Sequence, residues 1–336
     1  MIVPENLGLY QIMGGESENY RIFHGSLVLD KNSSIYSVIG IPPLPGTIIA
    51  FKKYQLCNND ESIWARYNRR YCRLVHDYTQ YSILTHTSTM LDPRFYTEVP
   101  VISTIDARRM LDPFRKLKKI MVHPEDSLHF KIIDFLNKTK RETGIELEFW
   151  GVTGSILADI HNPDISDIDL ILFGEENSEI IFEYLKRRRF RRIINWENLQ
   201  SRYEIDPKLL KLLSEGRSRF MWKDSKFSIT FIEGNIYRPK YCRTLQGFLS
   251  WDNLILKELR RFRSTIKIDS TNGALTYPPC IDANDYLLLS FDHILAPILY
   301  GSKCLRVDAL VGRTIDDIEI VFLGVKENRL TRIKTC

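Results

Sequence analysis

The sequence Gly151-Val-Thr-Gly-Ser155, followed after eleven residues by Asp167-Ile-Asp169-Leu-Ile-Leu-Phe-Gly174, decides the fold. Asp167 and Asp169 begin an apolar run, and residues i and i+2 of a strand point to the same face. The two carboxylates are therefore expected to project together. Adjacent carboxylates repel unless a cation lies between them, and hard divalent cations prefer oxygen ligands. The spacing predicts a metal site on one face of a strand.

The composition is typical of a soluble globular protein, with 44% hydrophobic and 26% charged residues in a chain of 336. This length allows two or three domains, each with its own core. No stretch approaches the ~20 apolar residues of a membrane span, and the N-terminal residues lack the pattern of a signal peptide. We expect a cytoplasmic protein without membrane association. The formal net charge of +5 weakly favours an anionic partner.

The cysteines are scattered along the chain, at positions 57, 72, 242, 280, 304 and 336. They form no Cys-x-x-Cys pair, and no histidine stands at zinc-finger spacing from them. The pattern therefore argues against a zinc site and against a secreted disulfide framework. Reduced, mostly buried thiols are expected.

The N-terminal part of the chain indicates antiparallel β-structure. Residues 20–54 contain three apolar runs separated by clusters of Pro, Gly, Asn and Ser. The following segment, residues 64–81, interleaves arginines with tyrosines and includes Arg69 and Arg70. Arginines among aromatic residues can grip phosphates and stack on bases. The alternative is a solvated face whose tyrosines fill the core of a small barrel.

Hydrophobic periodicity predicts an α+β fold, in which a central mixed sheet with helices is flanked by small antiparallel β-modules. Helices are expected at residues 104–117, 126–143, 178–186, 206–214 and 247–263, and central strands at 145–150 and 226–232. Pro113 is expected to split the first of these helical segments in two. Further strands are expected at residues 286–291, 304–311 and 318–323. The corresponding domains are an N-terminal β-rich module at 1–103, a central domain at 104–265 and a C-terminal β-rich module at 266–336.

A strongly basic run follows the helix expected at residues 178–186. Six of the seven residues from Lys186 to Arg192 are basic. Such a run is either a solvated helix end favoured by the helix dipole or a contact for polyphosphate or nucleic acid. The candidate nucleic-acid contacts are Arg69, Arg70, Arg187, Arg188 and Arg189.

The order Gly154-Ser155, spacer and Asp167-x-Asp169 on an apolar strand resembles the signature of the DNA polymerase β-type nucleotidyltransferase superfamily. The resemblance implies a helix after the Gly-Ser turn, with the aspartates on the next strand. It implies that Gly154 leaves room for a triphosphate and that Ser155 contacts its oxygens. Asp167 and Asp169 would hold Mg²⁺ or Mn²⁺. The alternative is a βαβ unit with incidental surface aspartates.

The flanking β-modules are similar to those of poorly characterised archaeal predicted nucleotidyltransferases, a likeness that implies no particular substrate. The superfamily usually supplies a third carboxylate from a later strand, on the same face as the first two. The corresponding strand is residues 226–232, where Thr230 stands in place of an aspartate. Glu233, just beyond that strand, and Asp224, in the turn before it, are the two candidates to replace it.

Three functional hypotheses follow. The first is a Mg²⁺-dependent nucleotidyltransferase that moves a nucleoside monophosphate from an NTP to an acceptor hydroxyl, with Asp167, Asp169 and Glu233 as catalytic residues. RNA is the favoured acceptor, because β-modules with aromatic residues and arginines suit single strands. The second is a non-catalytic nucleotide- or RNA-binding protein without the third carboxylate. The third is an enzyme that nucleotidylates a small molecule or a protein and whose β-modules form a dimer.

Overall fold

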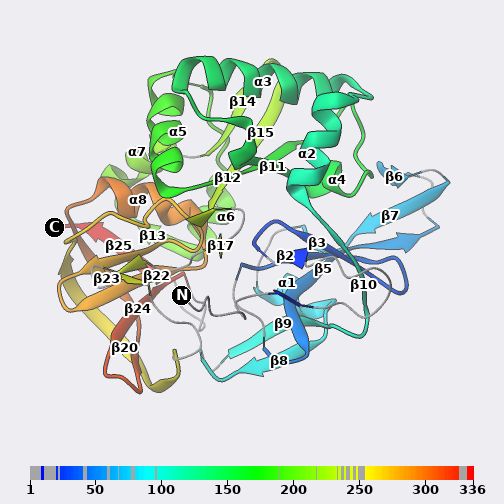
Figure 1. Cartoon of the computed structure of the whole chain (residues 1–336). Helices are drawn as coiled ribbons and strands as arrows, with labels where there is room; N and C mark the ends of the chain where they lie inside the picture. Colours follow the sequence, from blue (N-terminus) through cyan, green and yellow to red (C-terminus); the bar gives the residue numbers. More distant parts are fainter. Residues whose placement is uncertain are drawn as a thin grey trace, which may run out of the picture. The chain divides into compact units, whose positions relative to one another are not determined.

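The protein is a mixed α+β protein in the computed structural model (Figure 1). The structure describes residues 9–10, 20–21, 23–40, 44–58, 61–66, 68–76, 80–94, 97–188, 190–216, 218–232, 234–235, 238–239, 243–244, 247–248, 254–324 and 331–336. The chain forms two compact units. The first comprises Met1–Asp92, Thr97–Lys138 and Trp150–Ile171, and the second Pro93–Tyr96, Thr139–Phe149 and Leu172–Cys336. None of the described helices combines the length and the apolar character needed to cross a membrane.

An antiparallel sheet forms the N-terminal part of the chain, as expected from its apolar runs. Its strands are β3 (Leu27–Asp30), β4 (Ile35–Val38), β5 (Thr47–Cys57), β6 (Trp64–Arg66), β7 (Arg69–Arg73), β8 (Thr89–Asp92), β9 (Thr97–Ser103) and β10 (Ala107–Leu111). The main path runs β10-β3-β4-β5-β7-β6, and β9 pairs with both β5 and β8. Val28, Ile48, Ala50 and Ile102 lie in a core cluster of this sheet.

The helix predicted at residues 104–117 begins later than expected, so the prediction is wrong for its first part. Ala107–Leu111 forms β10, because it pairs antiparallel with β3. The helix α2 (Pro113–Val122) begins only at the proline, whose missing N–H is one that the first turn leaves unpaired in any case. The Asp112 side chain caps it by accepting hydrogen bonds from the backbone N–H groups of Phe114, at 2.8 Å, and Arg115, at 3.2 Å.

A four-stranded sheet in the order β11-β12-β15-β14 contains the aspartate strand. Its strands are β11 (Trp150–Thr153), β12 (Ile168–Phe173), β14 (Arg219–Trp222) and β15 (Ser225–Ile232). The helices expected around residues 126–143, 178–186 and 206–214 are confirmed as α3 (Ser127–Thr143), α5 (Glu175–Arg187) and α7 (Pro207–Gly216). The strand expected at 145–150 is displaced, because Leu147–Phe149 forms a 3-10 turn. Phe135 of α3 packs edge-on against Trp150 of β11, with ring centroids 6.3 Å apart.

A seven-stranded sheet forms the C-terminal part of the second unit. Its strands are β13 (Tyr203–Ile205), β20 (Leu256–Lys267), β21 (Cys280–Ala283), β22 (Tyr286–Ser290), β23 (Cys304–Thr314), β24 (Glu319–Leu323) and β25 (Thr331–Thr335). The helix expected at 247–263 was wrong, since β20 pairs along its whole length with β23. Phe262 and Ile266 are buried on one face of β20. Strand pairing overrides the local helical pattern here.

The remaining elements are short. The helices are α1 (Gln80–Thr85), α4 (Gly154–Leu157), α6 (Trp196–Arg202) and α8 (Ala296–Gly301), with a 3-10 turn at His293–Leu295. Three pairs of two-residue strands are β1 (Leu9–Tyr10) with β2 (Tyr20–Arg21), β16 (Gly234–Asn235) with β17 (Arg238–Pro239), and β18 (Arg243–Thr244) with β19 (Gly247–Phe248).

The expectation of reduced thiols is wrong for the five cysteines among the described residues, because all five are in disulfides. Cys57 of β5 is bonded to Cys72 of β7, and Cys304 of β23 to Cys336 beside β25, each with a Cα–Cα distance of 5.7 Å. Cys280 is also disulfide-bonded. The partners meet only when their strands pair, so their spacing in sequence carried no signal.

We predict that breaking the Cys57–Cys72 disulfide lowers the free energy of unfolding. The bonded residues are 15 positions apart. Closing a loop of that size lowers the conformational entropy of the unfolded chain, which raises its free energy by about 3 kcal/mol. A Cys57→Ser/Cys72→Ser variant should therefore lose about 2–4 kcal/mol in urea unfolding. Alkylation of unreduced, denatured wild-type protein should leave both cysteines unmodified in mass spectra. Complete alkylation of both would contradict the disulfide.

Candidate functional site

The Gly-Ser turn and both aspartates lie in the first unit, and the boundary of that unit falls within β12, after Ile171. The strand β11 leads into α4, and β12 begins directly after Asp167. Ile168 and Leu170 are completely buried, whereas Asp167 and Asp169 are half-buried. The alternation places both carboxylates on the less buried side of the strand.

Gly154 approaches Asp169 closely. Its φ of +67° lies in the left-handed region that favours glycine, and a Cβ atom built on it would lie 2.3 Å from Oδ2 of Asp169. Any side chain at position 154 would displace this carboxylate. The glycine of the motif is therefore required by the protein's own packing, in addition to the room that it would leave for a ligand.

The turn around Gly154 is held by backbone contacts. Ser155 is buried, and its carbonyl oxygen accepts a hydrogen bond of 3.0 Å from the N–H of Ile160. The Thr153 hydroxyl donates to the carbonyl oxygen of Gly25. The helix α4 has only four residues. It is too short to supply the aligned peptide dipoles of a longer helix.

A charged cluster that the sequence did not reveal follows this turn. Asp159, with φ +57°, forms ion pairs with Lys116 of α2 and, at 3.3 Å, with Arg66 of β6. The Lys116 side chain is 7% exposed, so its ammonium group depends on this carboxylate for compensation. The ion pairs join three elements behind the Gly-Ser turn. An inward-facing lysine between the apolar residues of α2 was the signal available in the sequence.

The described part of the central sheet offers no third carboxylate. Ser228 and Thr230 occupy the half-buried side of β15, opposite its buried aromatic and apolar residues. Among the four strands, Asp169 is the only residue that carries a carboxylate. Asp224 lies in the turn between β14 and β15, with φ +60°. Glu233 lies outside the described residues, so its expected role stays a prediction.

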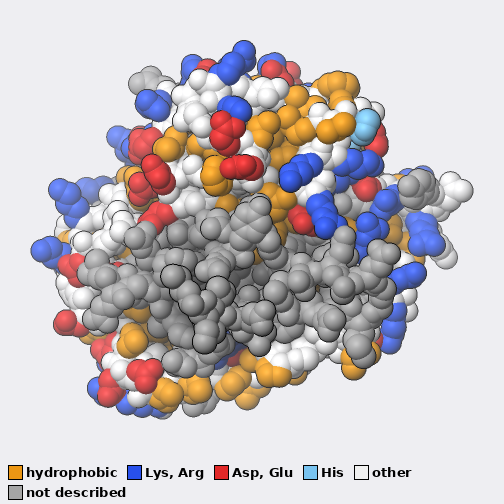
Figure 2. Space-filling view, in the orientation of Figure 1, with side chains coloured by type: hydrophobic (Ala, Val, Ile, Leu, Met, Phe, Trp, Pro, Cys, Tyr) orange, Lys and Arg blue, Asp and Glu red, His pale blue; other side chains and the backbone are white. Residues whose placement is uncertain are grey.

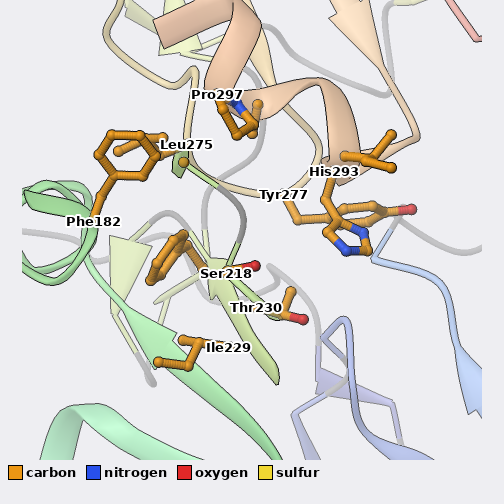
Figure 3. Close-up of a pocket in the computed structure, with 12 residues that line it drawn as sticks. Phe182, Ser218, Ile229, Thr230, Leu275, Tyr277, His293 and Pro297 are labelled. Atoms are coloured by element: carbon orange, nitrogen blue, oxygen red, sulfur yellow. The ribbon is translucent and has the colours of Figure 1, made fainter. Parts of the chain in front are cut away.

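A small cavity adjoins Thr230 in the second unit (Figure 3). Phe182 and Leu275 contribute apolar groups to its wall, and Ser218 and His293 polar ones. The space left for the centre of a water molecule is about 20 Å³. A cavity of that size holds roughly one water, so it is a packing defect rather than a nucleotide site.

The arginines of the basic run, residues 186–192, have different surroundings. Arg188 forms a two-point ion pair with Glu142, at 2.5 and 3.1 Å, and lies over the Tyr184 ring. The hydrogen bond and the charge of Glu142 raise the pKa of Arg188. This arginine therefore joins α5 to the end of α3. Arg189 lies outside the described residues.

A groove of about 670 Å³ lies beside the basic run and is lined in part by a half-buried arginine, Arg192. Its lining is Glu183, Lys186, Arg187, Phe190, Arg192, Ser214 and Glu215. In the described part of the chain, Nη1 of Arg192 has no hydrogen-bond partner, and burial lowers the pKa of Arg192 to about 10. The Arg192 guanidinium lies 5.8 Å from the Phe220 ring centroid. The groove combines basic and acidic side chains rather than a uniform positive charge.

Arg69 and Arg70 lie on β7 in the first unit, and both are exposed. Arg70 donates from Nη1 to the carbonyl oxygen of Ser62 at 3.0 Å. Tyr71, between the basic residues of this strand, is buried in a core cluster and offers no ring for base stacking. Basic and acidic side chains are interspersed on the visible surface of the molecule (Figure 2).

Three comparisons with known proteins identified no similar protein. No protein-family model, curated protein or solved structure matched the chain. The functional assignment therefore rests on the residues of this chain and their geometry.

Substitution of Gly154 tests its contact with Asp169. Gly46 is a matched control, because its φ is +71° and a Cβ there would meet nothing within 4 Å. We expect Gly46→Ala to cost about 1–2 kcal/mol of unfolding free energy through backbone strain. Gly154→Ala should cost roughly 1–3 kcal/mol more, because it also overpacks the site. Equal losses in urea unfolding would show that the close contact with Asp169 does not form.

Proposed function

We propose that this chain is a Mg²⁺-dependent nucleotidyltransferase, which moves a nucleoside monophosphate from an NTP to an acceptor hydroxyl. One observation carries the proposal: Gly154 leaves space for an oxygen of Asp169, so the Gly-Ser turn and the aspartate pair belong to one site. The same order of residues underlies the resemblance to the DNA polymerase β-type nucleotidyltransferase superfamily.

The aspartates suit a hard divalent cation. Asp167 and Asp169 are half-buried and supply carboxylate oxygens, which Mg²⁺ and Mn²⁺ prefer. Bound Mg²⁺ would neutralise triphosphate charge and orient the α-phosphorus for in-line attack. The chain's own contribution is positioning: Asp167 and Asp169 fix the place of the phosphates, and the side-chain-free Gly154 permits their approach.

RNA remains the proposed acceptor, held mainly through its phosphates. Arg187 lines the groove of the second unit, and Arg69 is exposed in the first. Arg188 is a weaker candidate, because Glu142 already engages its guanidinium. Since Tyr71 is buried, this strand would contact phosphates rather than bases.

A second candidate function is nucleotide binding without transfer. It is favoured by the lack of a third carboxylate on the described strands of the central sheet. Without a group that activates the acceptor hydroxyl, the site would still bind a metal–nucleotide complex but would not promote attack.

The aspartate pair should be required for nucleotide binding and not for folding. We expect Asp167→Asn/Asp169→Asn to abolish Mg²⁺-dependent NTP binding in calorimetric titration, because the neutral amides cannot replace two charged ligands. The circular dichroism spectrum should not change. Asp164→Asn, at an exposed position of the preceding turn, is the control and should bind normally. Unaltered NTP binding by the double variant would refute the proposal.

Incubation of the wild-type protein with Mg²⁺, labelled NTPs and RNA then separates the two candidates. Transfer of label to RNA supports the enzyme. Binding without transfer to RNA, protein or small acceptors supports the second candidate.

RNA affinity should fall with salt, because phosphate contacts release counterions. We expect Arg187→Gln to weaken binding and to reduce the slope of log affinity against log salt by about 1. Arg260→Gln is the matched control, because Arg260 on β20 is exposed and paired with Glu319 at 2.7 Å. A slope near zero for the wild-type protein would exclude RNA as the partner.

A further inference from the structure

Asp126, His129 and His161 converge in the first unit, where α3 begins and the chain leaves the α4 turn. One potential ligand atom from each residue lies within 4.8 Å of the other two. Oδ2 of Asp126 lies 2.9 Å from Nε2 of His161 and 3.5 Å from Nδ1 of His129. The two imidazole rings are neighbours, with centroids 5.3 Å apart.

Both imidazoles are buried with incomplete hydrogen bonding. The side chain of His129 is 2% exposed and that of His161 is 9% exposed. Nε2 of His129 and Nδ1 of His161 have no hydrogen-bond partner in the described part of the chain. Buried polar atoms are nearly always satisfied, so the hydrogen bonding of this cluster is incomplete. The nitrogens that face Oδ2 of Asp126 are the other two, Nδ1 of His129 and Nε2 of His161.

The backbone holds the carboxylate in place. Oδ1 of Asp126 caps α3 by accepting hydrogen bonds from the N–H groups of Leu128, at 2.9 Å, and His129, at 3.0 Å. This arrangement leaves Oδ2 directed to the histidines. The N–H of Glu125 donates to Nδ1 of His129 at 3.1 Å, so neutral His129 carries its proton on Nε2.

We propose that Asp126, His129 and His161 bind a divalent transition-metal ion of the Zn²⁺ class. Imidazole nitrogens with one carboxylate are characteristic ligands of such ions, whereas Mg²⁺ prefers oxygen alone. Ligand atoms at about 2.0–2.2 Å from Zn²⁺ lie roughly 3–3.5 Å from one another. The 3.5 Å separation between Oδ2 of Asp126 and Nδ1 of His129 fits that range. The 2.9 Å separation between Oδ2 and Nε2 of His161 is that of a hydrogen bond, and the two atoms would move apart by a few tenths of an ångström to share an ion. His129 binds through Nδ1 by releasing the Glu125 N–H, or through Nε2 after rotation of its ring.

The surrounding charges accommodate a cation. Lys116 is the nearby positive group that acts on His129, and its charge is compensated by the ion pair with Asp159. Asp126 is 17% exposed, so the ion can enter from its side. Three protein ligands leave a fourth position for water.

The ion would fasten the start of α3 to the loop that delivers the aspartate strand. This loop runs from His161 to Ser166, and its ends are joined by a hydrogen bond of 2.9 Å from the Asn162 N–H to the Ser166 hydroxyl. Asp167 follows immediately. The site is separate from the oxygen site formed by Asp167 and Asp169 and does not depend on the proposed transferase activity.

The test is titration of chelator-stripped, full-length protein with Zn²⁺ and with Co²⁺. We expect one tightly bound equivalent and a visible absorption spectrum for the Co²⁺ form. His129→Gln and His161→Gln should each weaken binding at least tenfold, because loss of even a group that hydrogen-bonds to a metal ligand typically costs roughly 10–100-fold in affinity. Both substitutions retain an amide that can hydrogen-bond, and circular dichroism checks that they fold.

Two controls define the site. His123→Gln removes an exposed histidine outside the cluster and should leave affinity unchanged. Asp167→Asn/Asp169→Asn should also bind Zn²⁺ normally, so failure of the nucleotide proposal and failure of this one remain distinguishable. Absence of stoichiometric binding, or equal affinity in wild-type, His129→Gln and His161→Gln proteins, would overturn the proposal and leave only a structural Asp–His hydrogen bond.

Discussion

The close approach of Gly154 to Asp169 is the contact on which the central site depends. A side chain at 154 would occupy the position of the Asp169 carboxylate, since the distance to Oδ2 would be 2.3 Å. Gly151 is constrained in the same way: a Cβ there would lie 2.9 Å from both Ile171 and Pro113. The two glycines of one strand-turn segment thus allow β12 and α2 to pack against it. A motif associated with ligand binding has a packing reason that operates without any ligand.

The same segment is held by contacts with other parts of the first unit. The Thr153 hydroxyl donates a hydrogen bond to the carbonyl oxygen of Gly25, and Asp159 forms ion pairs with Lys116 and Arg66. Each of these contacts joins the turn to a different part of the first unit. These contacts hold the turn that packs against Asp169, so less ordering of the turn is left for a metal or nucleotide to bring about on binding.

The hydrophobic pattern and the capping residues predicted the helices and strands whose formation is decided by residues close in sequence. The helix α3 followed from its apolar face and from Asp126 as its cap, and the alternation in β12 and β15 followed from strand periodicity. The prediction failed where a distant partner decides the structure. β10 and β20 carry helical patterns, but β10 pairs antiparallel with β3 and β20 with β23, each with one register shift. Pairing with a distant strand therefore outweighs the helical pattern of the segment.

Side-chain clusters were predictable only in part. Asp167 and Asp169 stand two residues apart, so strand geometry alone places them on one face. By contrast, His161 is 35 positions from Asp126, and Cys57 is 15 positions from Cys72. Neither spacing identifies a cluster, because the connecting chain can take many paths. Only the folded arrangement of α3, the α4 turn and the β5–β7 pair brings these residues together.

The most direct measurement is a crystal structure of the protein with Mn²⁺ and a non-hydrolysable NTP analogue, recorded with anomalous diffraction from manganese. Nucleotide binding at the aspartate pair predicts a manganese peak between Asp167 and Asp169, with the triphosphate against the Gly154–Ser155 turn. Manganese and nucleotide bound elsewhere, with the Asp169 carboxylate still lying against Gly154 and contacting no ion, would contradict it.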